Sequence, residues 1–417
     1  MRVLLVSANT EQINMRTLPL GPALLAAAAR RAGHETGLLD LGAEADPDGA
    51  VRGAVVAFAP GAIGVSVRNV DDQDIQSRRF LLEPVKEIVA VCRAASEAPI
   101  VLGGAGYSIF PEAALAYLGA DLGLRGEGEE AFPAVLDCLA QGKDPSAVPG
   151  VYAAGRGGRV ARSFLEDLDA LPLPEDPLWP AADPADPDLW VPVQTRRGCP
   201  LDCTYCSTAD IEGRAVRARS PQRVADHLRR LAEAGFRKLY FVDNTFNLPT
   251  DYALDLCRRV AALRLDLSWR CILYPGNVPD ELIAAMAQAG CAEVSLGFES
   301  GSLRVLRAMN KRFEPGEVRR ISESLAAHGI RRLGFLLLGG PEETRESVNE
   351  SLAFAESLRL EALKVTVGIR IYPRTPLART AVAEGIVAPD DDLLFPRFYL
   401  QPELEGWIAS VVPSRPS

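Results

Sequence analysis

Apolar runs alternate with amphipathic stretches through the first third of the chain. Short apolar runs at residues 2–7, 35–41, 62–67, 99–104 and 120–125 predict buried strands. Ala-rich or amphipathic stretches at 18–33, about 78–95, 111–119 and 129–142 predict helices between them. This alternation predicts an α/β fold with an open, doubly wound, Rossmann-like sheet over residues 1–150. Ligands of such sheets bind beyond the carboxyl ends of the strands, which here lie near residues 7–10, 66–69, 103–107 and 126–128.

The alternation stops over residues 151–190, which we interpret as a linker. Residues 151–163 predict a small hairpin that turns at Gly157 and Gly158. Residues 171–190 are rich in Pro and Asp and have no hydrophobic period, which is typical of an extended, semi-rigid connector. A polar stretch at 68–79 is interpreted either as a loop over the ligand face of the first domain or, slightly preferred, as a solvated surface loop.

From residue 191 onward, strands and helices alternate again. Strands are predicted at 191–195, 237–243, 267–271, 292–299, 331–340 and 362–373, with helices near 221–234, 252–263, 279–289, 315–328 and 344–358. Six strand–helix units are fewer than the eight of a closed barrel, so residues 191–390 predict a partial TIM-type (β/α)6 barrel. Residues 391–417 form a short C-terminal extension, whose Phe395, Phe398, Tyr399 and Trp407 are expected to cover the barrel bottom or opening.

A cysteine motif follows the first barrel strand. Cys199, Cys203 and Cys206 stand in a C-x3-C-x2-C spacing, which brings three soft sulfur ligands onto one short loop. Three thiolates without a histidine suit an iron–sulfur cluster better than a hard cation. A 4Fe-4S cluster held by three cysteines leaves one iron open to a small chelating molecule. The alternative is a structural zinc site completed by a cysteine from elsewhere, although no second C-x2-C pair is present.

The loop, with Tyr205 directly before the last cysteine, resembles the cluster loop of the radical S-adenosylmethionine (SAM) enzymes. The resemblance implies that the amino and carboxylate groups of SAM chelate the open iron. It also implies that the reduced cluster cleaves SAM to a 5′-deoxyadenosyl radical. Tyr205 is then a SAM-binding residue.

Polar residues at the ends of later barrel strands complete the expected SAM site. The segment 295–313 resembles the fourth-strand segment of many cobalamin-linked and methylthio-transferring radical SAM proteins. This resemblance implies that Glu299 binds the aminocarboxylate or ribose and that Lys311 or Arg312 reaches the carboxylate. Asp243 and Asn244 would contact the amino group or ribose, and Gly339 with Gly340 would let the backbone approach adenine. Without the resemblance, Glu299 is equally interpreted as an acid at a helix N-terminus and Arg312 as a surface charge.

The first domain resembles the cobalamin-binding domain that precedes many radical SAM domains. The resemblance lies in residues 18–35, 63–67, 100–106 with 110–112, and 124–129. A D-x-H-x-x-G motif is absent, and His34 is the only histidine of residues 1–150, so cobalamin would bind without a protein histidine on cobalt. The glycine pairs are also compatible with turns of a sheet that binds nothing. The expected cobalamin residues are Asn9, Thr10, Ser66, Arg68, Gly103, Gly104, Gly126 and Glu127.

Cys271 ends the third barrel strand and has two interpretations. A thiol pointing into the barrel cavity could donate a hydrogen atom to a substrate radical or hold a soft ligand, and Cys271 is therefore a candidate catalytic residue. Free cysteines are, however, mostly buried packing residues, and we favour packing here.

Composition limits the partners and the compartment. The 417 residues have a formal net charge of −10 and a sequence pI of about 5.1, without a Lys or Arg run, which argues against a nucleic-acid partner. No apolar stretch is long enough to span a bilayer or to serve as a signal peptide, so no membrane partner is expected. Five of the eight cysteines are scattered singly, which favours a reducing cytoplasm over a disulfide framework.

Together these features predict a cobalamin-dependent radical SAM enzyme that methylates an unactivated carbon of a small-molecule substrate. The expected cofactors are a 4Fe-4S cluster, SAM and cobalamin, with flavodoxin or ferredoxin as the electron donor. Two alternatives stay open. One is a radical SAM enzyme with another outcome, either rearrangement or transfer of the 3-amino-3-carboxypropyl group of SAM to a nucleophile. The other is a non-catalytic cobalamin or SAM sensor.

Overall fold

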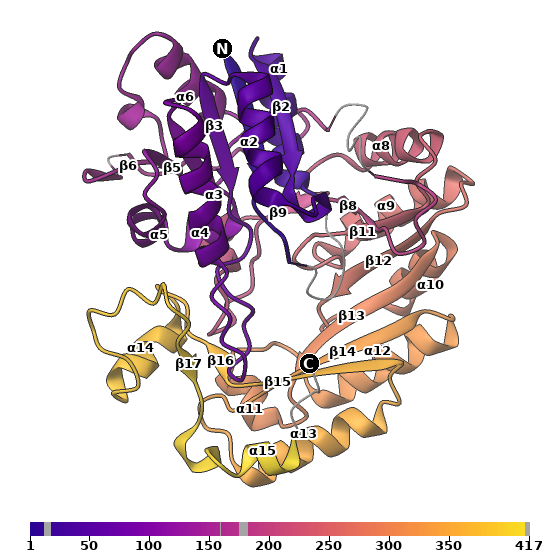
Figure 1. Cartoon of the computed structure of the whole chain (residues 1–417). Coiled ribbons are helices and arrows are strands. Elements are labelled where there is room, and N and C mark those ends of the chain that lie inside the picture. Colours follow the sequence, from indigo (N-terminus) through magenta and orange to yellow (C-terminus); the bar gives the residue numbers. More distant parts are fainter. Residues whose placement is uncertain (12–17, 159, 175–181, 413–417) are drawn as a thin grey trace. The chain divides into compact units, whose positions relative to one another are not determined.

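The computed structural model describes residues 1–11, 18–158, 160–174 and 182–412 (Figure 1). Residue 159 and residues 175–181 of the expected linker, and residues 413–417 of the expected extension, lie outside the described residues. The chain divides into two compact units. The first comprises Met1–Asp72, Arg79–Leu189 and Asp210–Gly213, and the second comprises Gln73–Arg78, Trp190–Ala209 and Arg214–Ser417.

The first unit is a sheet with helices on both faces, as predicted. In the described part of the chain its order is β2-β1-β3-β4-β5-β6-β7, and it is parallel up to β5. Its strands are β1 (Arg2–Ser7), β2 (Glu35–Asp40), β3 (Ala62–Ser66), β4 (Ile100–Gly103), β5 (Leu122–Leu124), β6 (Val151–Ala153) and β7 (Gly157–Gly158). Its helices are α1 (Leu20–Arg31), α2 (Pro47–Phe58), α3 (Leu82–Ala95), α4 (Ala105–Ile109), α5 (Pro111–Leu118) and α6 (Ala131–Ala140).

The strand order determines where these helices lie. Because β2 and β3 flank β1 on opposite sides, right-handed crossovers place α1 on one face of the sheet and α2 and α3 on the other. Accordingly, α2 lies beside α3 and α1 beside α6 (Figure 1). Small buried side chains of α1, such as Ala26 and Ala29, pack into the same core as Phe132 and Leu136 of α6.

Several details of the first unit differ from the predictions. Helix α2 was not predicted, and α3 begins at Leu82 rather than near residue 78. The expected hairpin is present, but residues 154–156 form its turn, with Gly155 at φ +70°, while Gly157 and Gly158 form β7. The hairpin also belongs to the first sheet, because β6 pairs antiparallel with β5.

The second unit contains the six predicted parallel strands. Among the described residues their order is β15-β14-β13-β12-β11-β8, an open sheet in chain order that confirms the partial barrel. The strands are β8 (Val191–Val193), β11 (Lys238–Phe241), β12 (Ser268–Leu273), β13 (Cys291–Glu299), β14 (Arg331–Leu338) and β15 (Ala362–Val367). The helices between them are α8 (Pro221–Glu233), α9 (Thr250–Ala262), α10 (Asp280–Gln288), α11 (Leu303–Ala308), α12 (Pro315–Ala327) and α13 (Arg345–Ser357).

Burial alternates along these strands as a barrel wall requires. Trp269, Cys271 and Leu273 of β12 are buried, while the intervening Ser268, Arg270 and Ile272 are only half-buried. On the buried face Trp269 packs edge-on against the ring of Phe241, with 5.1 Å between the ring centroids.

The sixth predicted strand is interrupted at Gly368. Here the backbone adopts φ +74°, and a Cβ would lie 2.9 Å from Cδ1 of Ile75. The segment Gln73–Arg78, which carries Ile75, counts with the second unit, so this part of the polar stretch at 68–79 is not a free surface loop. Beyond Gly368, β16 (Ile369–Arg370) leaves the parallel sheet and pairs antiparallel with β17 (Phe398–Tyr399).

The C-terminal segment lies at the carboxyl end of β14. The amide of Gln401 donates to the carbonyl of Gly339, and Tyr399 is buried, so this segment meets the barrel at the opening rather than the bottom. Phe395 is 50% exposed. The remaining elements of the second unit are β9 (Arg196–Arg197), β10 (Arg217–Ala218), α14 (Pro376–Ala383) and α15 (Ile408–Val411), and α7 (Thr208–Glu212) begins in this unit.

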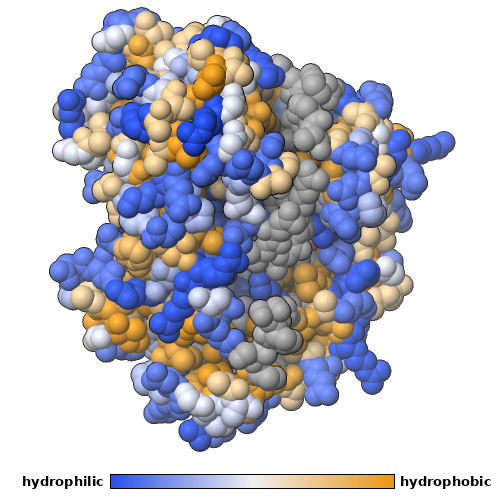
Figure 2. Space-filling view, viewed as in Figure 1, coloured by the Kyte–Doolittle hydropathy of each residue, from blue (hydrophilic) through white to orange (hydrophobic). Residues whose placement is uncertain are grey.

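None of the helices in the described residues combines the length and apolar character that crossing a bilayer demands. On the face shown in Figure 2, hydrophilic and hydrophobic residues are intermixed.

Candidate functional site

The cysteine loop follows β8 at the carboxyl edge of the barrel strands. Cys199 is buried, Cys203 is half-buried and Cys206 is exposed, and all three are free thiols. The preceding β9 pairs antiparallel with β10, which closes the loop at its base. The thiol of Cys206 donates to the hydroxyl of Thr208 over 3.3 Å.

Backbone hydrogen bonds attach this loop to distant parts of the second unit. The amide of Thr204 donates to the carbonyl of Met309, and its carbonyl accepts from the amide of Leu377. The side-chain amide of Asn310 donates to the carbonyl of Asp202 over 2.9 Å. The loop is therefore held by the segment after α11 and by the first turn of α14.

A buried ion pair fixes the residues that lead into the loop. The Arg196 guanidinium and the Asp243 carboxylate lie 3.1 Å apart, with side chains 3% and 1% exposed. Asp243 also accepts from the amides of Thr195 and Arg196 at 2.7 and 2.9 Å and from the Thr195 hydroxyl at 2.6 Å. A buried charge requires ionic and hydrogen-bond partners of this kind.

This network bears on the predicted roles of Asp243 and Asn244. Both carboxylate oxygens of Asp243 face Thr195 and Arg196, so the structure gives Asp243 a role in positioning the cysteine loop. Asn244, the next residue, is half-buried at the carboxyl end of β11. SAM binding by either residue stays a prediction.

Lys311, Glu299 and Tyr205 meet beside the cysteine loop. Nζ of Lys311 lies 3.2 Å from Oε1 of Glu299 and 5.2 Å from the centroid of the Tyr205 ring. The Lys311 side chain is 5% exposed and that of Glu299 is 14% exposed. Burial by itself lowers the pKa of the Lys311 ammonium, but Glu299, Tyr205 and Cys203 together outweigh burial and hold this pKa above its usual range. Burial raises the pKa of the Cys203 thiol, and the Lys311 charge opposes that rise.

Glu299 has a strained backbone. Its φ is +61°, and the amide of Ser300 donates to the carbonyl of Phe298. Glu299 is therefore the central residue of a γ-turn with positive φ. A non-glycine residue in this conformation costs about 1–3 kcal/mol and is found most often at functional sites. The pairing of β13 with β14 also shifts between Gly297 and Glu299.

Arg312 is separated from this group. Its side chain is 56% exposed and lies 3.3 Å from Asp202 on the outside of the loop. Of the two basic residues considered from the sequence, the structure therefore places Lys311, not Arg312, beside Glu299. Carboxylate binding by Arg312 stays a prediction that its position does not favour.

Gly339 and Gly340 follow β14 and are held by a buried acid. Both amides donate to Oε2 of Glu343, at 3.0 Å from Gly340. A Cβ on Gly339 would lie 2.5 Å from Cδ1 of Leu400, and one on Gly340 would lie 3.0 Å from Cδ1 of Ile369. Gly339 also has φ +93°, a backbone conformation that favours glycine, so the protein's own fold accounts for glycine at this position. An approach of SAM to this backbone stays a prediction.

Glu343 is 1% exposed, and its Oε1 has no hydrogen-bond partner in the described part of the chain. Burial raises the pKa of Glu343 to about 7, against the two glycine amides, which lower it. The sequence analysis did not identify Glu343. An acid a few residues after a Gly-Gly pair at a strand end was the available signal.

Cys271 lies in the core. Its side chain is 0% exposed on the same face of β12 as Trp269, and burial followed by contact with Cys291 raises the pKa of its thiol. The alternation of β12 turns this side chain into the packed face, as the favoured packing interpretation expects, and a catalytic role for Cys271 stays a prediction that its position does not favour.

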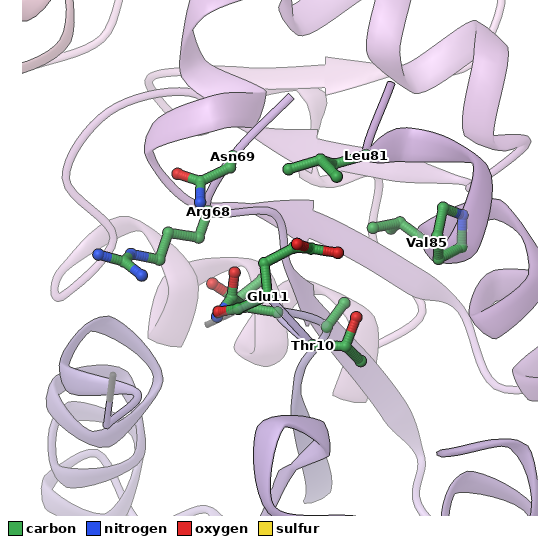
Figure 3. Close-up of a pocket in the computed structure, with 10 residues that line it drawn as sticks. Thr10, Glu11, Arg68, Asn69, Leu81 and Val85 are labelled. Carbon is green, nitrogen blue, oxygen red and sulfur yellow. The ribbon is translucent and has the colours of Figure 1, made fainter. Parts of the chain in front are cut away.

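The first unit contains a pocket at the edge where its strand order reverses. Ala8, Asn9, Thr10 and Glu11 follow β1, and Ser66, Arg68 and Asn69 follow β3. Leu81, Pro84 and Val85 at the start of α3 close the hollow, which has about 320 Å³ of space, partly open to solvent. Figure 3 shows Glu11 and Thr10 on one side of it, with Arg68 and Asn69 from the next strand end. Such a reversal is where doubly wound sheets bind ligands.

Four of the eight residues expected to bind cobalamin line this pocket: Asn9, Thr10, Ser66 and Arg68. The other four lie after β4 and β5, outside it. A Cβ on Gly104 would lie 2.5 Å from the carbonyl oxygen of Val67, and one on Gly126 would lie 3.0 Å from Arg162. Gly103 has more space, and Glu127 accepts from the amide of Leu165 over 2.8 Å. Cobalamin contacts by these four residues stay predictions.

His34 lies directly before β2, at the amino-terminal edge of the sheet. Its Nδ1 is 3.2 Å from the N-terminal nitrogen, and its Nε2 is 3.4 Å from Asp137. The pocket lies at the carboxyl edge, so His34 cannot reach a ligand there.

The three loop thiols do not surround one point. In the described residues, no three Cys, His, Asp or Glu side chains gather as ligands of one metal ion do. A 4Fe-4S cluster presents a separate iron to each thiolate, so its ligands need not converge.

Comparisons with known proteins agree with the division into two units. The radical SAM superfamily model matches residues 193–355, and the B12-binding domain model matches residues 6–136. An uncharacterized methyltransferase from Pyrococcus horikoshii is 28% identical over 93% of this chain and 84% of its own length. The tryptophan 2-C-methyltransferase of Streptomyces laurentii is 24% identical over 89% of this chain and 73% of its own length.

A solved structure shares the fold. The radical SAM methyltransferase TsrM from Kitasatospora setae, with cobalamin and a [4Fe-4S] cluster bound, superposes with a TM-score of 0.84 and 22% identity. The alignment covers 97% of this chain and 84% of TsrM. The chain is thus a two-part α/β protein with a three-cysteine loop at the mouth of a partial barrel. It carries a radical SAM domain over residues 193–355 and a B12-binding domain over residues 6–136.

The residues present fit the cofactors of this class, which are a 4Fe-4S cluster, SAM and cobalamin. Soft thiol donors occupy the loop, and an acid with a facing cation lies beside it where an aminocarboxylate could be recognised. Hydroxyl, amide and guanidinium groups line the pocket of the first unit.

Replacing Asp243 with Asn should destabilise the protein by about 3–5 kcal/mol, because Arg196 would remain buried without its counter-charge. The free energy of unfolding, measured by urea titration, tests this. Asp255→Asn removes an exposed pair with Arg259, whose side chains are 42% and 46% exposed, and should cost about 0.5 kcal/mol or less. Equal losses in the two variants would contradict the importance of the buried pair.

The raised pKa of Glu343 predicts that the protein becomes less stable as the pH rises. Its folded pKa, about 7, exceeds its ordinary 4.5, so the folded protein binds the extra proton and the free energy of unfolding falls between these pH values. The loss attributable to Glu343 is at most about 3 kcal/mol. Glu343→Gln should remove this part of the slope between about pH 5 and pH 8, whereas Glu342→Gln, at an exposed neighbour, should keep it. An unchanged slope in Glu343→Gln would show that the acid is not protonated on folding.

Proposed function

We propose that this protein is a cobalamin-dependent radical SAM enzyme that transfers a methyl group to an unactivated carbon of a small-molecule substrate by way of a 5′-deoxyadenosyl radical. One observation carries the proposal. A loop with three free thiols lies at the carboxyl edge of a partial barrel, and the same chain contains a sheet with a pocket at its strand-order reversal. The methyltransferase relatives described above support the choice of methyl transfer.

The residues of the second unit have distinct roles in this proposal. Cys199, Cys203 and Cys206 would hold three irons of the cluster. Glu299 and Lys311 would orient the aminocarboxylate of SAM, because they present an acceptor and a cation next to the loop. When bound, the reduced cluster supplies the electron that cleaves SAM, and cobalamin carries the methyl group.

The first unit would bind cobalamin through the residues around its pocket. Asn9, Thr10 and Ser66 offer amide and hydroxyl groups, and Arg68 offers a cation for an anionic part of the ligand. Residues 1–150 contain no histidine other than His34, so the cobalt would have no protein histidine as a ligand. Glu11 is already paired with Arg79 at 2.5 Å and helps to shape the wall.

The partners follow from the chemistry. The substrate is a small molecule, and a one-electron donor such as flavodoxin or ferredoxin would reduce the cluster. The half-buried face of the barrel strands, which includes Arg270 and Glu293, is the surface that would surround a substrate inside the barrel.

Product analysis tests the proposed reaction. The anaerobically reconstituted protein should hold iron and sulfide and release both S-adenosylhomocysteine and 5′-deoxyadenosine with turnover of a substrate found by screening small molecules. Cys203→Ala removes one of the three thiolates and should lower iron content and SAM cleavage to background. Cys257→Ala, at a buried thiol of α9, is the matched control and should retain both.

Other products would select an alternative. Methylthioadenosine as the coproduct would indicate transfer of the 3-amino-3-carboxypropyl group. Ligand binding without SAM cleavage under strong reductant would indicate a sensor. Zinc in place of iron, or a full cluster in Cys203→Ala, would refute the proposal.

Cobalamin binding has its own test in the first unit. Ser66→Leu fills part of the pocket and should weaken the binding of hydroxocobalamin at least about tenfold, a cost of about 1.4 kcal/mol. Ser96→Leu, at the opposite edge of the sheet before β4, should bind normally. Binding is followed by the absorbance of the protein-bound cobalamin after gel filtration. Equal cobalt content in the two variants would place the cobalamin elsewhere.

A further inference from the structure

One ammonium group is buried against the cysteine loop, and the chemistry described so far gives it no more than a share in SAM binding. Lys311 is 5% exposed, and Nζ lies 3.2 Å from Glu299 and 5.2 Å from the ring centroid of Tyr205. Tyr205 lies between two of the predicted cluster ligands. A charge that is shielded from water interacts strongly with a neighbouring charge, because the local dielectric constant is low.

We propose that Lys311 is a positioning residue whose fixed positive charge raises the reduction potential of the cluster and holds Glu299 in its strained conformation. This inference rests on the proposed function, because it requires a cluster on the loop. It goes beyond that function by assigning the control of the cluster's potential to one residue outside the cysteine motif.

The backbone around Lys311 is rigid. Asn310 has φ +57°, the amide of Lys311 donates to Leu306 at 2.8 Å, and that of Asn310 donates to Arg307 at 2.9 Å. These two bonds form a Schellman motif at the end of α11, with Asn310 at the left-handed position. Because the motif determines the direction of the chain after the helix, it directs Lys311 towards Glu299.

The same turn holds the cysteine loop. The carbonyl of Met309 accepts from Thr204, and the side chain of Asn310 donates to Asp202 at 2.9 Å. The amide of Arg312 donates to the phenol oxygen of Tyr274 at 2.8 Å. The loop and the ammonium are therefore fixed to one short segment, which keeps their separation constant.

The sign of the effect follows from electrostatics. Reduction adds one electron, taken from the reductant, to a cluster already bound by three thiolates. A buried cation stabilises the added negative charge, so reduction becomes more favourable. Glu299 carries the opposite charge and has the opposite effect, so the two residues are tested separately.

The test is an EPR-monitored dithionite titration of the full chain after anaerobic reconstitution with iron and sulfide. Lys311→Met keeps the apolar stem and removes the charge. It should lower the equilibrium constant for one-electron reduction of the cluster about tenfold or more. The midpoint potential should then fall by about 59 mV or more. Lys311→Arg should restore the wild-type midpoint, and Lys143→Met, at an exposed position after α6, should not change it.

The outcomes separate this inference from the proposed function. Equal midpoints in wild type and Lys311→Met at equal iron content overturn the inference alone, whereas a wild-type chain without a cluster overturns both. If the Lys311→Met protein does not retain iron, the midpoint potential is measured in the Glu299→Gln protein instead. Removal of the acid must then raise the midpoint, and an unchanged or lower value overturns the inference.

Discussion

The buried pair of Arg196 and Asp243 is the constraint on which the cysteine loop depends. Three thiols can hold a cluster only if the chain leading to them has a defined course, and this pair ties that course to the end of β11. The guanidinium also lies 4.6 Å from the ring centroid of Tyr252 and donates to the carbonyl of Leu248. An aromatic face and satisfied hydrogen bonds reduce the cost of keeping both charges away from water.

A second group of charges lies on the other side of the loop. Lys311 is held by a helix-terminal turn and Glu299 by a strained γ-turn, so neither side chain is free to relax. Strain of this kind persists only where the surrounding structure enforces it. Here the long strand β13, packed between β12 and β14, provides that support.

The ligand pocket of the first unit depends on the order of its strands. It results from topology, because the connections that follow the neighbouring strands β1 and β3 leave in opposite directions at the carboxyl edge. Several glycines near this edge are needed by the protein's own packing. At Gly104, for example, the backbone of Val67 leaves no room for a side chain. A glycine-rich strand end is therefore weak support for a ligand contact at that residue.

The sequence by itself determined the order of elements, the two-part fold and the cysteine motif. Hydrophobic periodicity and the spacing of Cys199, Cys203 and Cys206 are local properties that survive without knowledge of contacts. The tertiary structure placed Lys311, not Arg312, beside Glu299, placed Cys271 in the core, turned Asp243 toward Arg196 and brought Glu343 to the amides of Gly339 and Gly340. The pairing of Asp243 with Arg196, for example, joins residues that are far apart in the sequence, and no local pattern of residues encodes such a contact.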